Sequence, residues 1–183
     1  MHPFPELNTE HLILNKFGSS DIPELLAIFK DPVYAQRTLN IPYPYTEADG
    51  IAWSRHIHEQ FLLGNHYSFA IRQKGDPKLI GSIALMINQR FDRGELGYWL
   101  AKEYWNKGYM TEATKAIIQF GFEILQLNKI LATHLTINPA SGAVMLKCGM
   151  VWEAELKQHT KKGTVYHDHI QYRILKSDYL KNS

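Results

Sequence analysis

Short stretches in which apolar and polar residues alternate recur along the chain, as they do in a β-strand that buries one face. Residues 66–73 are the clearest case, because Tyr67, Phe69 and Ile71 alternate with smaller or more polar side chains. A turn at 74–78 then leads to an apolar partner strand. The stretches that predict strands are residues 11–17, 66–73, 79–88, 95–100, 129–137, 151–159 and 165–174.

Apolar residues spaced three and four apart predict helices between these strands. The predicted helices cover about 20–31, 46–63, 110–127 and 138–149. The long helix should bury one face, made of Ala113, Ile117, Phe120, Ile124 and Leu127. Thr46 and Asp49 have the spacing of a capping box. In the last helix Asn138 is the expected N-cap, and Gly149 suits the left-handed position after the C-terminus.

The elements follow in the order βααβββαβαββ, with further turns at 90–94 and 161–163. About seven strands and several helices predict an α+β fold, in which a mixed sheet carries helices on both faces. Residues 1–183 contain no repeat, low-complexity tract or linker-like stretch, so we expect a single domain.

Composition removes several classes of function. A net charge of +2 with both signs scattered does not predict a nucleic-acid-binding surface. The apolar runs are far shorter than the roughly 20 residues of a membrane helix, and the N-terminus lacks a secretory-signal pattern. The single cysteine, Cys148, excludes an internal disulfide and a cysteine-rich zinc motif. We therefore expect a cytoplasmic protein with no nucleic-acid or membrane partner and no metal.

The segment "YWNKGYMTEA" places Gly108 between a predicted strand and the long helix. A helix N-terminus exposes unpaired N–H groups and partial positive charge, so it binds phosphates where the backbone can approach them. Gly108 either serves only the turn into the helix or allows such an approach. The phosphate-loop patterns GxxxxGK[ST] and GxGxxG do not occur in the sequence, which disfavours the familiar nucleotide-binding folds.

Several segments in this order resemble the GNAT superfamily of acyl-CoA-dependent N-acetyltransferases, and within it the RimJ/RimL-like branch, which acetylates ribosomal-protein N-termini. The two most specific are "LGYWLAKEYWNKGYMTEA" and, about thirty residues on, "NPASGAVMLKCGM". Weaker likenesses are "TEHLILNKFGSSD", "IPYPYT", "LIGSIAL" and "YHDHIQYRIL". The resemblance covers nearly the whole chain and implies a GNAT-like, mostly antiparallel sheet and acetyl-CoA as cosubstrate.

The resemblance places the family's diphosphate-binding pattern, [QR]xxGx[GA], on residues 105–110, with Gly108 as the fixed glycine. Trp105 replaces the basic or amide residue, and Met110 replaces the second small residue, so Met110 must contribute through its backbone amide. The residues expected to face coenzyme A here are Asn106, Lys107, Gly108, Tyr109, Met110 and Thr111. For Lys107, a direct charge contact and a solvated position remain alternatives.

Acetyl transfer requires a deprotonated amine, a polarised carbonyl and a departing thiolate. An α-amine loses its proton most readily, because its ordinary pKa is about 7.7–8.0 against about 10.4 for lysine. The resemblance makes Glu95 the candidate base, although it could instead be a solvated turn residue beside Arg93. It also implies that a backbone N–H near Leu100, where the family's strand is bulged, contacts the cofactor and donates to the oxyanion.

For the leaving group, many GNAT enzymes use a tyrosine at the position that Met145 occupies here, and methionine cannot donate a proton. The RimJ/RimL-like branch instead implies Ser141, either as a cofactor contact or as the acid. Asn138 is expected to cap its helix and to contact the pantetheine. The resemblance also places Asp168 in the last hairpin beside the site.

Three aromatic residues around the loop "IPYPYT", namely Tyr43, Tyr45 and Trp53, either pack in the core or contact the acceptor. His167 and His169 share one strand face, but they lack a third metal ligand.

Three hypotheses follow: an acetyltransferase of protein or peptide N-termini, an acetyltransferase of a small amine such as a polyamine, amino acid or antibiotic, and a non-catalytic acyl-CoA sensor. The sequence does not show the oligomeric state and leaves a homodimer open.

Overall fold

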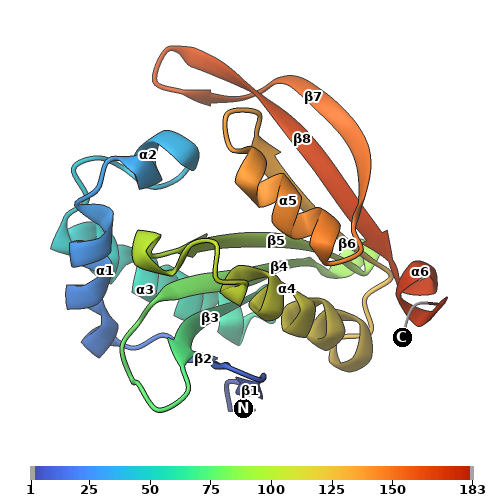
Figure 1. The fold of residues 1–183 in the computed structure, drawn as a ribbon, viewed down its shortest axis with the longest axis horizontal. Coiled ribbons are helices and arrows are strands. Elements are labelled where there is room, and N and C mark those ends of the chain that lie inside the picture. The colour runs from blue at the N-terminus through green and yellow to red at the C-terminus, as the bar shows by residue number, and fades with distance from the viewer. Residues whose placement is uncertain (1–2, 182–183) are drawn as a thin grey trace.

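A computed structural model describes residues 3–181 as one sheet of eight strands in the order β1-β2-β3-β4-β5-β6-β8-β7 (Figure 1). Neighbouring strands are antiparallel except for the pair β5–β6, which is parallel. The strands are β1 (Leu7–Asn8), β2 (Leu12–Lys16), β3 (His66–Gln73), β4 (Gly81–Asn88), β5 (Arg93–Leu100), β6 (Lys129–Leu135), β7 (Val151–Lys162) and β8 (Val165–Leu175).

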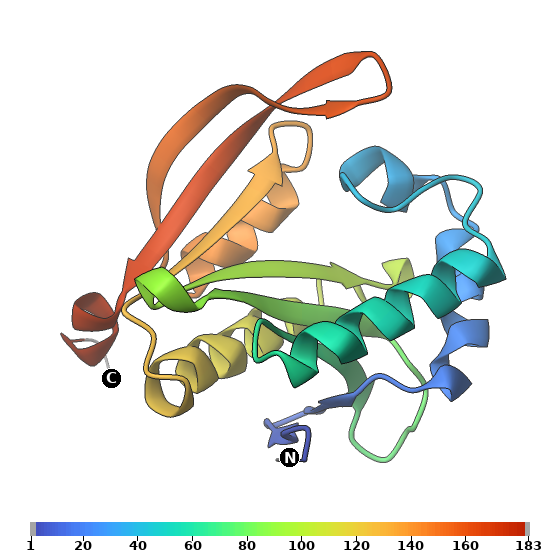
Figure 2. The same cartoon turned by 180° about the vertical axis from the view of Figure 1, so that it is seen from behind.

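Helices cover both faces of the sheet, α1 and α3 on one face and α4 and α5 on the other (Figures 1 and 2). We call these the α3 face and the α4 face. The α-helices are α1 (Ile22–Phe29), α2 (Val33–Arg37), α3 (Glu47–Leu62), α4 (Tyr109–Gln119), α5 (Pro139–Lys147) and α6 (Lys176–Lys181). Short turns of other helix types are η1 (Ser19–Asp21), η2 (Gln89–Phe91), η3 (Lys102–Tyr104) and η4 (Phe120–Ile124). No helix in residues 3–181 is both long and apolar enough to cross a membrane.

Two hydrophobic clusters hold the helices to the sheet. The cluster on the α4 face includes the fully buried side chains of Ile83, Leu85 and Ile117. The cluster on the α3 face includes Leu25 of α1 and Ile57 of α3. Each side chain of this size contributes about 1.5–3 kcal/mol when it is fully buried, so packing on the sheet, more than helix propensity, fixes where the helices lie.

The predicted fold class is confirmed: the sheet is mixed and mostly antiparallel, with helices on both faces. Strand β3 has the predicted bounds, and Thr46 and Asp49 form the predicted capping box at α3. The two-residue strand β1 adds an eighth strand that is too short to show alternation. The turn predicted at 161–163 is wrong for Lys161 and Lys162, because β7 continues to Lys162.

The predicted apolar face of the long helix is correct at Ala113, Ile117 and Phe120 and wrong at Ile124, and Leu127 is buried but lies beyond the end of the helix. The side chain of Ile124 is 67% exposed, whereas Ala113, Ile117, Phe120 and Leu127 are buried. The helix changes from α to π geometry over residues 120–124. A π turn adds one residue per turn, so it rotates Ile124 away from the face that a regular helix would give it.

Strands β5 and β6 separate toward their C-terminal ends. Their pairing runs over four residue pairs and ends at Leu96 and Ala132. Beyond that point β5 stays paired with β4 as far as Leu100, and β6 stays paired with β8 as far as Leu135. The sheet therefore opens between two strands that are each held firmly by their other neighbour.

Candidate active site

A cavity of about 400 Å³, here called the central cavity, lies where β5 and β6 separate. Four parts of the chain line it: α2, the end of β5, the segment leading into α4, and α5 with the residue before it. The lining residues are Val33, Tyr34, Arg37, Thr38, Tyr98, Trp99, Leu100, Tyr104, Trp105, Asn106, Gly108, Tyr109, Met110, Thr111, Asn138, Ala140, Ser141, Ala143, Val144 and Lys147. Most of the predicted cofactor-binding residues are thus brought together on one cavity.

The N-terminus of α4 opens onto this cavity. Gly108 is the residue before the helix and has φ = +85°, the left-handed conformation that favours glycine. A Cβ placed on Gly108 would meet nothing within 4 Å, so the space beside it is open. Asn106, two residues earlier, also has positive φ (60°). Both conformations turn the chain sharply into α4 and leave the first N–H groups of the helix without intrahelical acceptors.

Met110 and Lys107 contribute to this end of the cavity in different ways. The side chain of Met110 is 7% exposed and packs in the core of the α4 face, so its backbone amide is the polar group it can offer to the cavity. Lys107 lies outside the lining, and its ammonium group lies 5.2 Å from the ring centre of Tyr104.

The main chain of Leu100 is fixed at the end of β5. Its carbonyl oxygen accepts hydrogen bonds from the indole Nε1 of Trp105 (2.7 Å) and the hydroxyl of Tyr34 (3.3 Å). Ala101 donates to the carbonyl of Ile80, the residue before β4 (2.8 Å), so by strand alternation the N–H of Leu100 points away from β4, into the gap beside β6. The expected bulge is wrong: β4 and β5 pair over residues 81–100 without a register shift. The strand separation, not a bulge, exposes this N–H.

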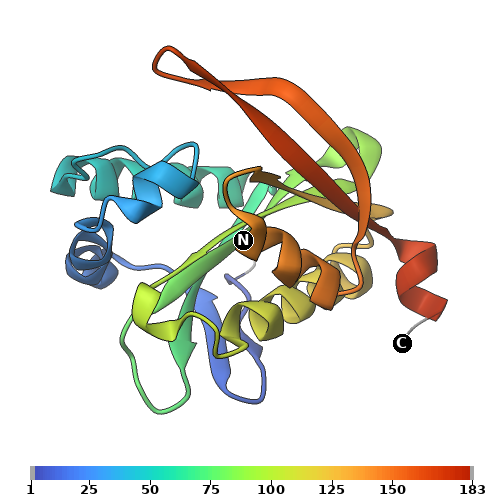
Figure 3. The same ribbon diagram turned by 45° about the horizontal axis from the view of Figure 1, so that its top comes forward.

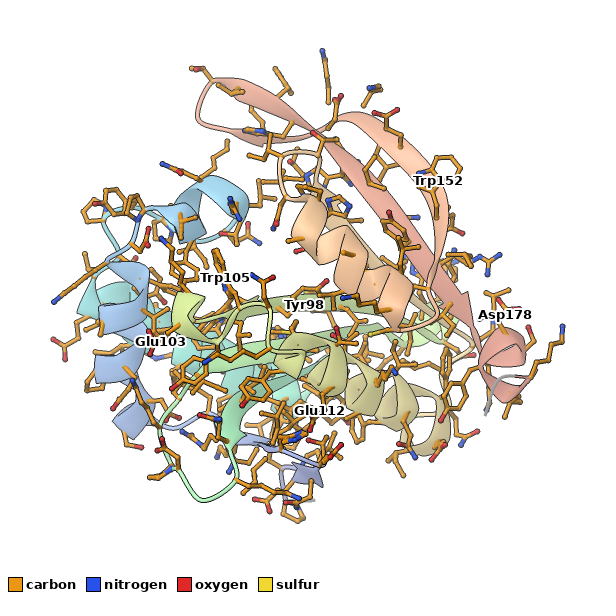
Figure 4. All side chains as sticks on the ribbon, in the orientation of Figure 1. Tyr98, Glu103, Trp105, Glu112, Trp152 and Asp178 are labelled. Atoms are coloured by element: carbon orange, nitrogen blue, oxygen red, sulfur yellow. The ribbon has the colours of Figure 1, made fainter. Side chains whose placement is uncertain are left out.

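Tyr98 links β5 to α5 across the gap (Figure 4). Its hydroxyl donates to the carbonyl of Ser141 at 2.9 Å. Burial raises the pKa of Tyr98 well above its ordinary value, so the phenol remains a neutral donor. Tyr98 was not among the predicted site residues, although its alternation with Leu96 and Leu100 in "ELGYWL" could have placed it on the same face as those two residues.

Asn138 and Ser141 lie side by side at the start of α5. The amide nitrogen of Asn138 donates to the hydroxyl of Ser141 (3.1 Å) and to the carbonyl of Arg37 (3.4 Å). The expected capping role is wrong in its chemistry, because the Asn138 side chain makes no cap hydrogen bond to the helix. Gly149 does have the predicted left-handed conformation after the helix, with φ = +81°. Met145 is buried and lies outside the cavity lining.

Helix α2 supplies the part of the cavity that was not predicted from the sequence. The Tyr34 hydroxyl donates to Leu100 and accepts from the amide of Lys102 (2.8 Å), and burial raises the pKa of Tyr34 to about 12. The guanidinium of Arg37 lies 5.5 Å from the ring centre of Trp105. A helix of five residues is too short to show a periodic pattern of apolar residues, so the sequence pattern does not predict it.

Glu95 lies on the other side of the sheet from α4 and α5. The strand register places Glu95 beside Leu131 of β6, on the α3 face, and its carboxylate accepts a hydrogen bond from Thr133 (3.4 Å). In the view from behind, α3 crosses β3 to β5, whereas the described helices leave the same face of β6, β8 and β7 open (Figure 2). Glu95 is not a lining residue of the central cavity but reaches this open face beside the strand gap.

The predicted acceptor contacts lie outside the central cavity. Tyr45 and Trp53 pack against the α3-face cluster, Tyr45 with its ring 4.8 Å from that of Phe29, and burial raises the pKa of Tyr45 to about 12. Tyr43 is 58% exposed and precedes a cis peptide bond. The structure therefore brings Tyr45 and Trp53 to the α1–α3 side of the sheet, and none of the three residues lines the cavity.

The hairpin histidines have other partners. His169 is buried, and its ring nitrogen Nε2 lies 2.8 Å from the hydroxyl of Thr160. Asp168 accepts hydrogen bonds from the main chain of Gln158 and the ammonium of Lys157, which hold the pKa of its carboxyl below the ordinary value. Across residues 3–181, the His, Cys, Asp and Glu side chains form no group of three or more that could hold a metal ion.

Comparison with known proteins adds three findings. Residues 11–151 match the family model described as "Acetyltransferase (GNAT) domain". The "Uncharacterized N-acetyltransferase p20" of Bacillus licheniformis is 30% identical over 175 residues, which cover 94% of this chain and 97% of that protein. The "Spermidine N(1)-acetyltransferase" of Vibrio cholerae is 27% identical over 143 residues, which cover 76% of this chain and 80% of that protein.

Among solved structures, the ribosomal-protein-S5-alanine acetyltransferase of Vibrio fischeri superposes with a TM-score of 0.81. The match covers 96% of this chain and 98% of that protein at 23% sequence identity, so it bears on the fold.

Proposed function

The chain belongs to the GNAT acetyltransferase family, and we propose that it transfers an acetyl group from acetyl-CoA to the α-amine of a protein or peptide N-terminus. As an N-acetyltransferase of this family it uses acetyl-CoA and acts on amines. The observation that carries the proposal is the juxtaposition of the α4 N-terminus with the strand gap, in one cavity. The α4 N-terminus suits a diphosphate, and the gap suits a thioester.

The cavity fits such a ligand. Backbone N–H groups from Asn106 to Thr111 would hold the diphosphate, because the space beside Gly108 is open and the helix N-terminus favours negative charge. Leu100 would bind the thioester oxygen through its N–H, with its own carbonyl held by Trp105 and Tyr34. When bound, acetyl-CoA supplies an activated acetyl group at this point.

The amine would approach from the open α3 face, where Glu95 lies. Glu95 precedes Leu100 by five residues along β5, a rise of about 16 Å, so Glu95 would accept the amine proton through a chain of waters, while Thr133 orients its carboxylate. The amine nitrogen forms a bond to the carbonyl carbon, the carbon–sulfur bond breaks, and the sulfur leaves as a thiolate. The hydroxyl of Ser141, held by Asn138, lies in the cavity where it could contact this sulfur. Direct attack in a ternary complex requires no covalent enzyme intermediate.

An α-amine acceptor is supported by chemistry and by relatives. A single weak base suffices for an α-amine, whose ordinary pKa is about 7.7–8.0. The Vibrio fischeri structure, which shares the fold, is described as a ribosomal-protein-S5-alanine acetyltransferase, an enzyme whose named acceptor is a protein. A small polyamine is the second candidate, because the spermidine N(1)-acetyltransferase of Vibrio cholerae matches 76% of the chain.

The test is release of free thiol from acetyl-CoA in the presence of an acceptor panel. The panel contains a peptide with a free N-terminus, the same peptide N-terminally blocked but carrying a lysine, and spermidine. We expect turnover with the first and little with the other two. Turnover with spermidine alone would select the second candidate, and tight acetyl-CoA binding without turnover on any amine would indicate a non-catalytic sensor.

A further inference from the structure

The ammonium group of Lys162, at the end of β7, is bound by main-chain carbonyls from a distant part of the sequence. Its Nζ donates to the carbonyls of Ala35 (2.5 Å), Thr38 (3.0 Å) and Ile41 (3.3 Å). These three acceptors span the end of α2 and the loop that follows it. We call this set of contacts the Lys162 latch.

The contacts of Lys162 differ in kind from those of the neighbouring lysines. Lys161 is exposed, and its ammonium lies 5.2 Å from the ring centre of Tyr166. Lys157 is exposed and pairs with carboxylates. Lys162 is partly buried, burial lowers its pKa, and it forms no ion pair with a carboxylate of the described residues. Its three N–H groups instead match three carbonyls at a helix C-terminus, where a cation is favoured.

The latch holds a wall of the central cavity. Four residues at the acceptors or just before them line the cavity: Val33, Tyr34, Arg37 and Thr38. Side chains tie α2 to three separate elements: Tyr34 ties it to the end of β5, Asn138 to the start of α5, and Lys162 to the β7–β8 hairpin. The hairpin extends past α5 on the side of α2 (Figure 3). Helix α2 therefore spans the opening between β5 and β6, and the hairpin fixes its far end.

The position of α2 in the cavity decides whether a shift of this helix affects the acceptor amine or acetyl-CoA. The N-terminus of α4 and helix α2 lie apart in the fold and both line the cavity, so we call these two parts its α4 end and its α2 end (Figure 1). Leu100 is bonded to the α2 end through Tyr34. If the diphosphate binds at α4, the thioester and the amine meet near Leu100 and α2. A shift of α2 would then alter the placement of the acceptor more than the grip on the diphosphate.

We propose that Lys162 is a positioning residue for the acceptor amine, acting through the carbonyls of α2 and the loop after it. This inference rests on the proposed acetyl transfer and deepens it, because it assigns the β7–β8 hairpin a role in acceptor use. Lys162 itself does not touch the reacting atoms in this proposal. It keeps α2 and the hairpin at a fixed separation, so that the amine meets the thioester at the right place.

The test compares Lys162→Met with the matched control Lys161→Met, since both remove one ammonium from the same end of the hairpin. For Lys162→Met we expect the KM for the acceptor to rise about tenfold, with the Kd for acetyl-CoA changing less than about twofold. Backbone hydrogen exchange should accelerate over residues 33–41. Lys161→Met should leave all three quantities near their wild-type values. Lys162→Arg, which keeps a cationic donor, should restore most of the acceptor KM.

The proposal is overturned if Lys162→Met behaves like Lys161→Met, or if both lose acetyl-CoA binding and acceptor use in parallel. If Lys162→Met does not fold, Lys162→Gln, which keeps two N–H donors without the charge, provides the same comparison. A wild-type chain that transfers no acetyl group to any amine would contradict the proposed function instead. In that case, unchanged exchange over 33–41 in Lys162→Met would separately exclude the latch.

Discussion

The two ends of the central cavity are built by different means. At the α4 end, backbone conformation alone shapes the site: Gly108 and Asn106 have positive φ, and the helix presents its N–H groups. At the α2 end, side-chain hydrogen bonds between α2 and other elements shape the site. Tyr34 reaches Leu100, Asn138 reaches Arg37, and Lys162 reaches three carbonyls across a separation of more than 120 residues.

The two ends therefore place different demands on the sequence: one binds through the main chain, and the other depends on particular side chains. A diphosphate can be held by main-chain donors whatever the side chains are, so the α4 end needs little more than one glycine and a helix. An acceptor amine must be placed against one carbon atom, and misplacement by about 1 Å can cost about 100-fold in rate. We therefore expect mutations at the two ends to separate into effects on cofactor affinity and effects on turnover.

The largest effect should come from Glu95→Gln, which tests the reactive end. If Glu95 is the base, kcat/KM for the acceptor falls about 100-fold or more, and acetyl-CoA affinity stays unchanged. Protonation of the acceptor amine, whose ordinary pKa is about 7.7–8.0, lowers kcat/KM with falling pH in both enzymes, so only the additional decline that protonation of a base produces should disappear in the variant. Steady-state kinetics over pH measures both.

The matched control is Glu153→Gln, which removes a second carboxylate, the partner of Lys129 and Gln171. This control should keep the pH profile of the wild type. A Glu95→Gln enzyme with the full acidic decline and near-normal turnover would remove Glu95 from the mechanism.

An effect of intermediate size should come from Gly108→Val, which tests the α4 end. Valine at φ = +85° is strained by about 1–2 kcal/mol, and its side chain would occupy the open space beside the helix N-terminus. We expect the Kd for coenzyme A to rise about tenfold or more, measured by calorimetry.

Gly75→Val is a close control for backbone strain, because Gly75 has φ = +83°, an equally open surrounding, and a position in the β3–β4 turn. It should lose similar stability while binding coenzyme A normally. Equal affinity losses in both variants would show that strain, and not the cavity, accounts for the change.

The smallest effect should come from Glu112→Gln, in the first turn of α4 (Figure 4). Burial raises the pKa of the Glu112 carboxyl, but hydrogen bonds from Thr9 and from the main chain and ring of His11 outweigh it and hold the pKa below the ordinary value. A carboxyl with a lowered pKa stabilises the fold above its unfolded pKa, and this contribution is lost as the pH falls through the folded value.

Urea unfolding should therefore show that Glu112→Gln costs about 1 kcal/mol at pH 7 and less near pH 3. Glu103→Gln, at an exposed pair with Lys78, should change the free energy of unfolding little at either pH. A pH-independent difference between Glu112→Gln and wild type would contradict the assigned cause.

Local patterns were sufficient to predict most of the fold. Strand β3 follows from the alternation around Phe69, α3 from the capping box at Thr46, and the end of α5 from Gly149. Each of these signals lies within a few residues of the element that it predicts. Most of the predicted cofactor-binding residues likewise lie on one cavity, because they occupy two short segments, before α4 and at α5.

The features that escaped prediction depend on contacts between distant segments or on irregular geometry. Helix α2 has only five residues, and its place is fixed by partners such as Asn138 and Lys162 that no local pattern connects to it. The exposure of Ile124 results from a π turn, which leaves no mark in residue type. Tyr98 is visible as a strand residue, but its bond to Ser141 depends on how closely α5 approaches β5.

The four parallel residue pairs between β5 and β6 have a further consequence for mechanical strength and assembly. They are the strand pairing that joins the part of the sheet made of β1 to β5 to the part made of β6, β8 and β7, and main-chain bonds from Asn128 and Lys129 to Asp92 extend this seam at one end. Pulling on the two termini would load this seam, so we expect it to be the weak line of the sheet. A ligand bound between the two strands would contact both parts of the sheet and stabilise the seam. Substrate binding should therefore also raise the force needed to unfold the protein.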